Sequence, residues 1–348
     1  RFDLREIFLK PGPAQLAALD AAITERRPDA VLFESLFTGA LMLLSRPGER
    51  PPVVNLGIVP LGLASRDTAP FGLGIKPMPG AFGRMRNAAL TLVARKVIFR
   101  KLQRYASELV EAAGGTLRAD FMSSPGLADA IVQFTVPSFE YPRSDLPETV
   151  HFVGPVSRTR ASDMPLPEWW GDLDGSRPVV HVTQGTVANT DFGELIDPAI
   201  EGLADEDVIV VVSTGGRPVP VRDYPANVRI ASYLPYDKLL PLTDVMVTNG
   251  GYGGVHYALE HGVPLVTAGL TEDKIEVTAR VDWFGVGVDL HTDRPTPKQV
   301  REAVRCVIVA PEYRARSARI GRDIVASPGL PGLERVLTDI VASRAAAA

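Results

Sequence analysis

The stretch Val245–Pro264, which reads VMVTNGGYGGVHYALEHGVP, decides the fold of the second half of this chain. An apolar run at 245–248 leads into a glycine cluster, a segment of helical character, and Gly262-Val263-Pro264, which opens a second apolar run. This order predicts strand, glycine turn, helix and strand. Glycines let the backbone approach a ligand closely, and a helix N-terminus carries partial positive charge. We therefore predict that this segment holds a phosphorylated ligand; a tight turn without a ligand is the alternative.

Composition is that of a soluble globular enzyme. The 348 residues are 45% hydrophobic and 22% charged, and this length is typical of roughly two domains. The net charge of −4 argues against a broad surface for nucleic acid or an anionic membrane, although it leaves room for a local cationic pocket. We expect no nucleic-acid partner.

Cysteine usage and the ends of the chain give further expectations. Cys306 is the single cysteine, so the chain has no intrachain disulfide and no cysteine metal cluster. We find no signal peptide and no apolar run long enough to span a bilayer, so the expected location is cytoplasmic. The sequence starts at Arg1 without an initiator methionine or an opening strand, and we expect further residues to precede it.

Apolar spacing in the first half predicts helices at 4–26, 36–44 and 85–113 and strands at 30–33, 52–59, 130–135 and 149–153. Residues 65–83 are rich in glycine and proline and predict a long loop. The basic stretch 84–104 either lines the mouth of a substrate site or is a solvated helix face, which is commoner for a long helix.

The second half alternates more cleanly. Strands are predicted at 179–183, 208–213, 228–231, 245–248, 264–267 and 287–290, and helices at 192–202, 236–242, 276–284 and 296–309. Continuous apolar strands alternating with helices indicate doubly wound parallel sheets. We predict two Rossmann-like α/β domains facing across a cleft, with ligands at the carboxyl ends of the strands. The expected bounds are 1–155 and 178–330 for the domains, 156–177 for the linker and 331–348 for a C-terminal helix.

The glycine cluster fits a dinucleotide fingerprint only in part. Gly251 and Gly253 supply two of its three glycines, but His256 stands at the third position. Asp273 lies at a suitable distance to hold a ribose. His256 and His261 have no acidic partner at metal-site spacing, so we assign no metal.

The same residues resemble the donor-binding signature of the UDP-glycosyltransferase family, which includes plant small-molecule and bacterial antibiotic or macrolide enzymes. The family pattern is HGGxGTxxEALxxGVP followed by Asp-Gln, and this chain has NGGYGG at 249–254, Ala258-Leu259, Gly262-Val263-Pro264 and Asp273. VVHVTQGT at 179–186 resembles the first strand and Gly-Thr loop of the family's second domain. YLPY at 233–236 resembles the aromatic-x-Pro-Gln segment that holds the base.

The resemblance implies the GT-B fold and a metal-independent site for a nucleotide diphosphate sugar, UDP- or TDP-linked, as co-substrate, with no other cofactor. The implied donor-binding residues are Gly185, Thr186, Tyr233, Leu234, Asn249, Gly250, Gly251, Tyr252, Gly253, Gly254, Tyr257, Asp273 and Lys274.

Four of these positions depart from the family pattern. Asn249 replaces the histidine and donates hydrogen bonds without charge. Gly254 replaces a threonine, so only backbone contact remains there. Tyr257 replaces the ribose-binding glutamate. Lys274 replaces glutamine and adds a positive charge, whereas Asp273 keeps the acceptor for sugar hydroxyls.

Catalysis in this family resembles general-base chemistry, in which a histidine of the first domain deprotonates the acceptor hydroxyl and a carboxylate orients that histidine. All five histidines here lie at or after residue 151, so the resemblance implies that the base histidine lies outside this chain, on residues that we expect to precede Arg1. Glu34 stands at the strand end that matches the orienting carboxylate; its alternative role is to cap the next helix. His181 lies within an apolar strand, where core packing is the commoner role.

The sequence therefore predicts an inverting hexosyltransferase that acts on a hydroxyl of an apolar small molecule such as a natural product or antibiotic. A sugar-nucleotide epimerase on the same architecture and a non-catalytic nucleotide-sugar-binding partner subunit remain as alternatives.

Overall fold

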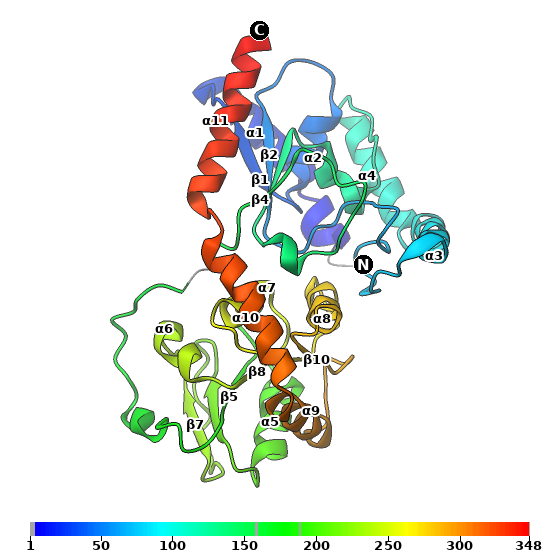
Figure 1. Cartoon of the computed structure of the whole chain (residues 1–348). Helices are drawn as coiled ribbons and strands as arrows, with labels where there is room; N and C mark the ends of the chain where they lie inside the picture. The colour runs from blue at the N-terminus through cyan, green and yellow to red at the C-terminus, as the bar shows by residue number, and fades with distance from the viewer. Residues whose placement is uncertain (1–3, 157–158, 188, 348) are drawn as a thin grey trace. The chain divides into compact units, whose positions relative to one another are not determined.

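The computed structural model describes residues 4–156, 159–187 and 189–347 (Figure 1). The chain forms two compact units. Residues 1–154 and 328–348 make up the first unit, and residues 155–327 make up the second. The C-terminal helix thus belongs to the unit that contains the N-terminus.

The first unit is built on a four-stranded parallel sheet in the order β1-β2-β3-β4. Its strands are short and mostly buried, and the register pairs Phe33 with Asn55 and Asn55 with Ile131. The strands are β1 (Val31–Glu34), β2 (Val53–Gly57), β3 (Ala130–Gln133) and β4 (Val150–Phe152).

Helices cover both faces of this sheet, because each face presents apolar side chains. Val31, Phe33 and Val53 pack with α1, α2 and α4 in one core cluster. Val54 and Val132 pack on the other face against Val336 of α11. The helical segments are η1 (Leu4–Leu9), α1 (Gly12–Arg26), α2 (Thr38–Ser45), α3 (Gly80–Val93), η2 (Ala94–Ile98), α4 (Arg100–Ala112), η3 (Phe121–Leu127), η4 (Pro137–Phe139) and α11 (Leu330–Ala347).

The second unit has a six-stranded parallel sheet in the order β10-β9-β8-β5-β6-β7. The order reverses between β5 and β8, and ligands of doubly wound sheets bind beyond the carboxyl ends of the strands at such a reversal. The strands are β5 (Val179–Thr183), β6 (Ile209–Ser213), β7 (Val228–Ala231), β8 (Val245–Thr248), β9 (Leu265–Thr267) and β10 (Gly287–Asp289).

The central strands β5, β6 and β8 are buried along their whole length, as their continuous apolar sequences predict. The helical segments of this unit are η5 (Glu168–Asp172), η6 (Phe192–Glu194), α5 (Ile196–Leu203), α6 (Tyr236–Leu239), η7 (Leu240–Leu242), α7 (Tyr252–Glu260), α8 (Lys274–Trp283), α9 (Pro297–Val309) and α10 (Pro311–Ala326).

Three segments differ from the sequence-based expectation. The helix expected at 4–26 is interrupted at Lys10 and Pro11. The helix expected at 85–113 is divided into α3, the π-helical segment η2 and α4, with Phe99 between the last two. Helix α10 was not predicted; it packs against α7, where a Cβ on Gly321 would lie 2.4 Å from the Leu259 carbonyl oxygen.

Candidate functional site

The carboxyl ends of β5 and β8 bring the two predicted glycine loops together. Gly185 follows β5 with φ +73°, and Gly250 follows β8 with φ +84°, conformations that glycine adopts without strain. Asn249 Nδ2 donates a 2.7 Å hydrogen bond to the Gln184 carbonyl oxygen and so ties the loops to each other. These loops lie where the strand order reverses, which is the expected ligand position.

A hollow of about 630 Å³ opens beside the β5 loop. Five of the predicted donor-binding residues line it, namely Gly185, Thr186, Tyr233, Leu234 and Tyr257. Tyr233 is 54% exposed and is set against Gly216, where a Cβ would lie 2.3 Å from the tyrosine hydroxyl. An exposed aromatic ring beside a glycine turn is suited to stack on a flat base.

Part of the expected linker forms a wall of this hollow. Thr159 and Ser162 both line it. Glu260 Oε2 accepts hydrogen bonds from the Thr159 amide at 2.9 Å and from the Thr159 hydroxyl at 2.8 Å. The Ser162 amide donates to Asp237 Oδ2 at 3.0 Å. These contacts have no local sequence signal, because they join residues 75 to 101 positions apart.

A buried polar pair supports the floor of the hollow. His181 Nδ1 lies 2.9 Å from the Val211 carbonyl oxygen, so Nδ1–H donates and Nε2 accepts from the Tyr236 hydroxyl at 3.1 Å. Burial lowers the pKa of His181 to about 4 and raises the pKa of Tyr236. The Tyr236 ring stands edge-on to Tyr257 at 5.5 Å. His181 is thus neutral and part of the core.

Asn189 is a functional neighbour that sequence reasoning missed. Its buried Nδ2 donates to the carbonyl oxygens of Gly185 at 2.9 Å and Thr214 at 3.0 Å. Arg217 Nε donates to its Oδ1 at 3.1 Å. One amide therefore fixes the loop after β5 against the loop after β6.

The remaining predicted residues lie around the loop after β8 rather than in the lining of the hollow. Tyr252, Gly253 and Gly254 form the first turn of α7, and Gly251 precedes it as the N-cap residue. The exposed backbone N–H groups of such a turn favour an anion.

Lys274 and Asp273 approach the same loop from the start of α8. A Cβ on Gly250 would lie 3.9 Å from Lys274 Cβ. Lys274 is buried and its ammonium group donates to Glu272. Burial raises the pKa of Asp273, while the charge of Lys274 opposes that shift.

The predicted carboxylate of the first unit stands at the end of β1. Glu34 Oε1 accepts a 3.1 Å hydrogen bond from the Leu36 amide. Burial raises the pKa of this half-buried carboxyl, and the Leu36 contact opposes the rise. Beside it the Ser35 hydroxyl donates to Asn55 Oδ1 at 3.2 Å.

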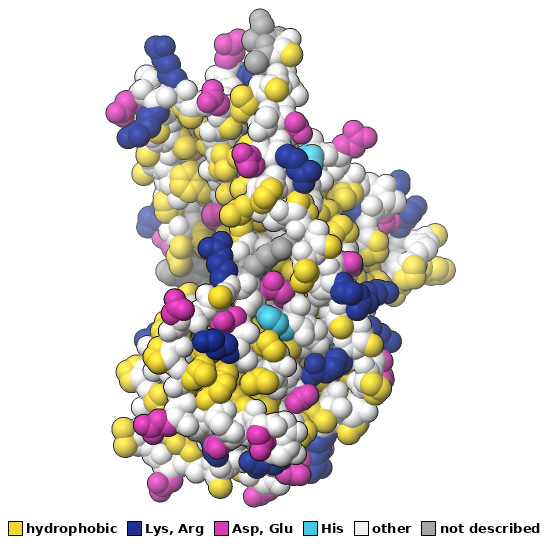
Figure 2. Space-filling view, turned by 60° about the vertical axis from the view of Figure 1, so that its left-hand side comes forward, with side chains coloured by type: hydrophobic (Ala, Val, Ile, Leu, Met, Phe, Trp, Pro, Cys, Tyr) yellow, Lys and Arg dark blue, Asp and Glu magenta, His cyan; other side chains and the backbone are white. Residues whose placement is uncertain are grey.

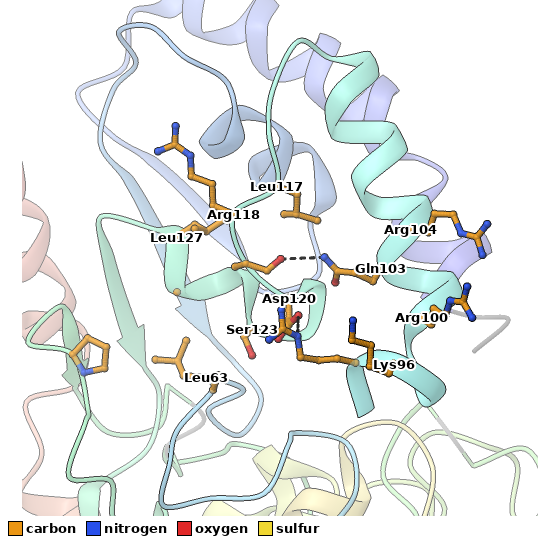
Figure 3. A pocket seen from close by; sticks show the side chains of 15 residues that line it. Leu63, Lys96, Arg100, Gln103, Arg104, Leu117, Arg118, Asp120, Ser123 and Leu127 are labelled. Atoms are coloured by element: carbon orange, nitrogen blue, oxygen red, sulfur yellow. Dashed lines mark hydrogen bonds and ion pairs between the residues drawn. The ribbon is translucent and has the colours of Figure 1, made fainter. Parts of the chain in front are cut away.

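A second hollow, of about 770 Å³, lies in the first unit. Four cations of the basic stretch 84–104 line it, namely Arg95, Lys96, Arg100 and Arg104, whereas no residue of the predicted donor site does. Lys96 points into it, while Arg95 pairs with Asp120 at 2.9 Å (Figure 3). Arg100 and Arg104 extend from the far side of α4 in the same view (Figure 3).

Within the described ranges, no group of three or more His, Cys, Asp or Glu is placed to hold a metal ion. The described helices are also too short or too polar to cross a membrane.

Comparison with solved structures identifies the fold. The glycosyltransferase of kitacinnamycin superposes with a TM-score of 0.69 at 22% identity, covering 95% of this chain and 80% of that one. The spinosyn rhamnosyltransferase SpnG complexed with thymidine diphosphate gives 0.63 at 18% identity, covering 96% and 80%; it has also been solved with spinosyn aglycone. The expected GT-B fold is confirmed.

Sequence relatives define the family. The 4'-demethylrebeccamycin synthase of Lentzea aerocolonigenes is 44% identical over 91% of this chain and 75% of that protein. UDP-glycosyltransferase 2 of Phaeomoniella chlamydospora is 34% identical over 98% of this chain and 78% of that protein. Residues 196–339 match the family described as erythromycin biosynthesis protein CIII-like, C-terminal domain.

The chain belongs to the UDP-glycosyltransferase family, and it is a hexosyltransferase. The epimerase and non-catalytic alternatives are not favoured.

Proposed function

We propose that the second unit binds a nucleotide diphosphate sugar across the carboxyl ends of β5 and β8, UDP-linked as the family name suggests, with TDP as the other candidate. The observation that carries this proposal is the hollow beside the β5 loop, which gathers Gly185, Thr186, Tyr233 and Tyr257 at the reversal of strand order. Tyr233 stacks on the base. The diphosphate lies against the glycine turn and first helical turn of α7, where backbone N–H groups stabilise the leaving group without a metal.

The neighbouring side chains then have distinct roles in this proposal. Asn249 contacts the diphosphate as a neutral donor, and Lys274 supplies a positive charge close to it. Asp273 accepts hydrogen bonds from sugar hydroxyls. Its raised pKa reflects burial, and the hydrogen bonds of a bound sugar would favour the ionised form.

The acceptor in this proposal is an apolar hydroxylated small molecule such as a natural product. The relative named for rebeccamycin and the spinosyn aglycone complex support this class of acceptor. Attack of the hydroxyl on the anomeric carbon inverts its configuration. Glu34 orients the general base, and that base is not a histidine among residues 1–150.

A donor screen tests the proposal. The full-length protein is incubated with UDP- and TDP-linked hexoses and several hydroxylated aglycones, and products are identified by mass and by the anomeric configuration of the new bond. We expect one nucleotide class to give a hexosylated aglycone of inverted configuration. Retention of configuration would contradict the mechanism. Interconversion of nucleotide sugars without an acceptor would instead favour an epimerase.

A further inference from the structure

One stretch of the chain carries a local excess of positive charge. Residues 68–107 contain eight Lys or Arg and no Asp or Glu. The net charge of the whole chain is −4, so the rest carries −12 once these eight positive charges are set aside. On the face drawn in Figure 2, by contrast, Lys and Arg are interspersed with Asp and Glu over much of the surface. The low net charge of the chain therefore conceals a strongly basic segment.

The same stretch exposes a row of large apolar side chains, which we call the α3 ridge. Its members are Phe82, Met85, Leu92, Val93 and Val97, exposed by 77%, 63%, 58%, 47% and 70%. At 100° per residue the first four fall within roughly 100° of one another around the helix axis. Helix α3 projects from the side of its unit, away from the sheet (Figure 1). Single exposed apolar residues are ordinary, but five large ones along one helical stretch mark a contact surface.

The fold fixes the ridge outward. Gly83 and Asn87 lie on the buried side of α3. A Cβ on Gly83 would lie 1.7 Å from the Met78 carbonyl oxygen, so the segment that leads into the helix packs closely against it there. Asn87 Nδ2 donates to the Arg66 carbonyl oxygen at 3.1 Å, and Arg86 donates to the Lys76 carbonyl oxygen at 2.8 Å. The helix is therefore anchored by its small and polar side.

Cations flank the ridge without neutralising partners. Lys96, Arg100, Lys101 and Arg104 form no ion pair with any residue that the structure describes, and all four are exposed. Lys96 points into the 770 Å³ hollow beside the ridge (Figure 3). A helix that combines exposed apolar side chains with unpaired cations has the composition of segments that lie in the interface of an anionic bilayer.

We propose that α3, η2 and the first turns of α4 dock on the surface of an anionic lipid bilayer, with the α3 ridge in the acyl boundary and the cations among the head groups. The proposal goes beyond the glycosyl transfer reaction and does not depend on it. Charge selects this occupant. A second copy of the same face would bring like charges together, and a nucleic acid offers no apolar phase for five large side chains.

Co-sedimentation with vesicles tests the proposal on the full chain. One set of vesicles is phosphatidylcholine alone, and the other is phosphatidylcholine mixed equally with phosphatidylglycerol. We expect binding to the anionic vesicles that weakens with added salt. Replacing Lys96, Arg100, Lys101 and Arg104 together by Gln should lower the partition coefficient on the order of 100-fold or more, given the contribution of each cation near the surface. Phe82→Ser with Val97→Ser should also release the protein.

The matched control removes the same kinds of side chain from the second unit. Arg319→Gln and Arg322→Gln with Val309→Ser change exposed residues of α9 and α10, and we expect vesicle binding to stay at the wild-type level. As a second measurement, the fluorescence of a Phe82→Trp variant should shift to shorter wavelength on anionic vesicles only. Absent binding, equal binding to both vesicle types, or an equal loss in the control variant would overturn the proposal.

Discussion

The two parallel sheets end in different ways. Loops after β5, β6 and β8 carry Gly185, Gly215 and Gly250 with φ of +73°, +61° and +84°, so the sheet of the second unit ends in backbone that approaches a ligand closely. In the first unit, strand β1 ends at Glu34, a residue with a charged side chain. The Glu34 carboxylate accepts a hydrogen bond from the Leu36 amide. The difference suits two tasks. Diphosphate is bound by backbone N–H groups, whereas deprotonation of a hydroxyl depends on side-chain charge.

The largest expected effect is on kcat, and it should arise at the end of the first sheet without affecting nucleotide binding at the second. Glu34→Gln should lower kcat by about 10²–10⁴-fold, the usual contribution of a general base and its support, while the affinity for UDP stays unchanged. Steady-state kinetics with calorimetry of UDP checks both quantities. Glu25→Gln, an exposed change on α1, is the control and should leave kcat unaltered. If Glu34→Gln also lowered the affinity for UDP, catalysis and nucleotide binding could not be assigned to separate sheet ends.

The pH profile sharpens the same point. Burial raises the pKa of Glu34, and the ionised carboxylate is the active form. As pH falls through this raised pKa the group is protonated. If Glu34 orients the base as proposed, kcat/KM should decline at a higher pH than an ordinary glutamate would cause. Glu34→Gln should lack this acid limb. An unchanged limb in that variant would assign the titration to another group.

His181 provides the corresponding buried group in the second unit. Its pKa of about 4 lies below the ordinary value near 6.5, so the unfolded state binds the proton more readily. The free energy of unfolding should therefore decrease as pH falls from about 6.5 towards 4, by up to about 3 kcal/mol. His181→Gln should reduce this slope in denaturant titrations relative to the wild-type protein. Equal slopes in the two proteins would contradict the buried neutral assignment.

The smallest expected effects divide roles within the donor loops. Loss of a hydrogen bond to a charged group costs about 1.5–3 kcal/mol, so Asn249→Ala should weaken UDP by roughly tenfold or more. Asp273→Ala should slow turnover of the nucleotide sugar and leave free UDP affinity nearly unchanged. Calorimetry measures both, with Asn227→Ala as a control, because that amide caps backbone carbonyls beside α5. If Asn249→Ala and Asp273→Ala weakened UDP binding equally, the two residues could not be assigned separate roles.

Sequence reasoning was most successful where the backbone itself forms the site. The continuous apolar strands β5, β6 and β8 and the glycines after them are local signals, since positive φ and close approach both require glycine. The departures at Asn249 and Lys274 were also visible in sequence. The contact of Asn249 with Gln184 was not, because it joins residues far apart in the sequence and depends on where the chain returns.

The missed elements lacked a local signal. Helix α10 packs through Ser317, Ile320, Gly321 and Ile324, and two small residues in that face weaken the apolar periodicity that marks a helix. The break at Phe99 contains neither glycine nor proline; it follows the π-helical segment η2, and π-helical turns are a recognised cause of helix kinks. The sequence around Asn189 is that of a surface loop. Its role depends on the hydrogen bond to Thr214 in the loop after β6, which only the fold brings close.

The sequence pattern did not predict the exposure of the α3 ridge either. Residues 84–104 show apolar spacing and basic charge, and a buried apolar face is the ordinary outcome of that pattern. The structure instead buries Gly83 and Asn87 and turns the apolar side outward. Which side of an amphipathic helix packs is decided by tertiary fit.

Titration of UDP into the full chain tests the central claim, that the loops after β5 and β8 hold the nucleotide of the donor. We expect one UDP site by calorimetry. Stacking of a base on an aromatic ring contributes about 1–3 kcal/mol, so Tyr233→Ala should weaken UDP by roughly 5- to 150-fold, while Glu34→Gln leaves it unchanged. The account is contradicted if the folded protein binds neither UDP nor TDP at millimolar concentration, or if Glu34→Gln weakens UDP as much as Tyr233→Ala.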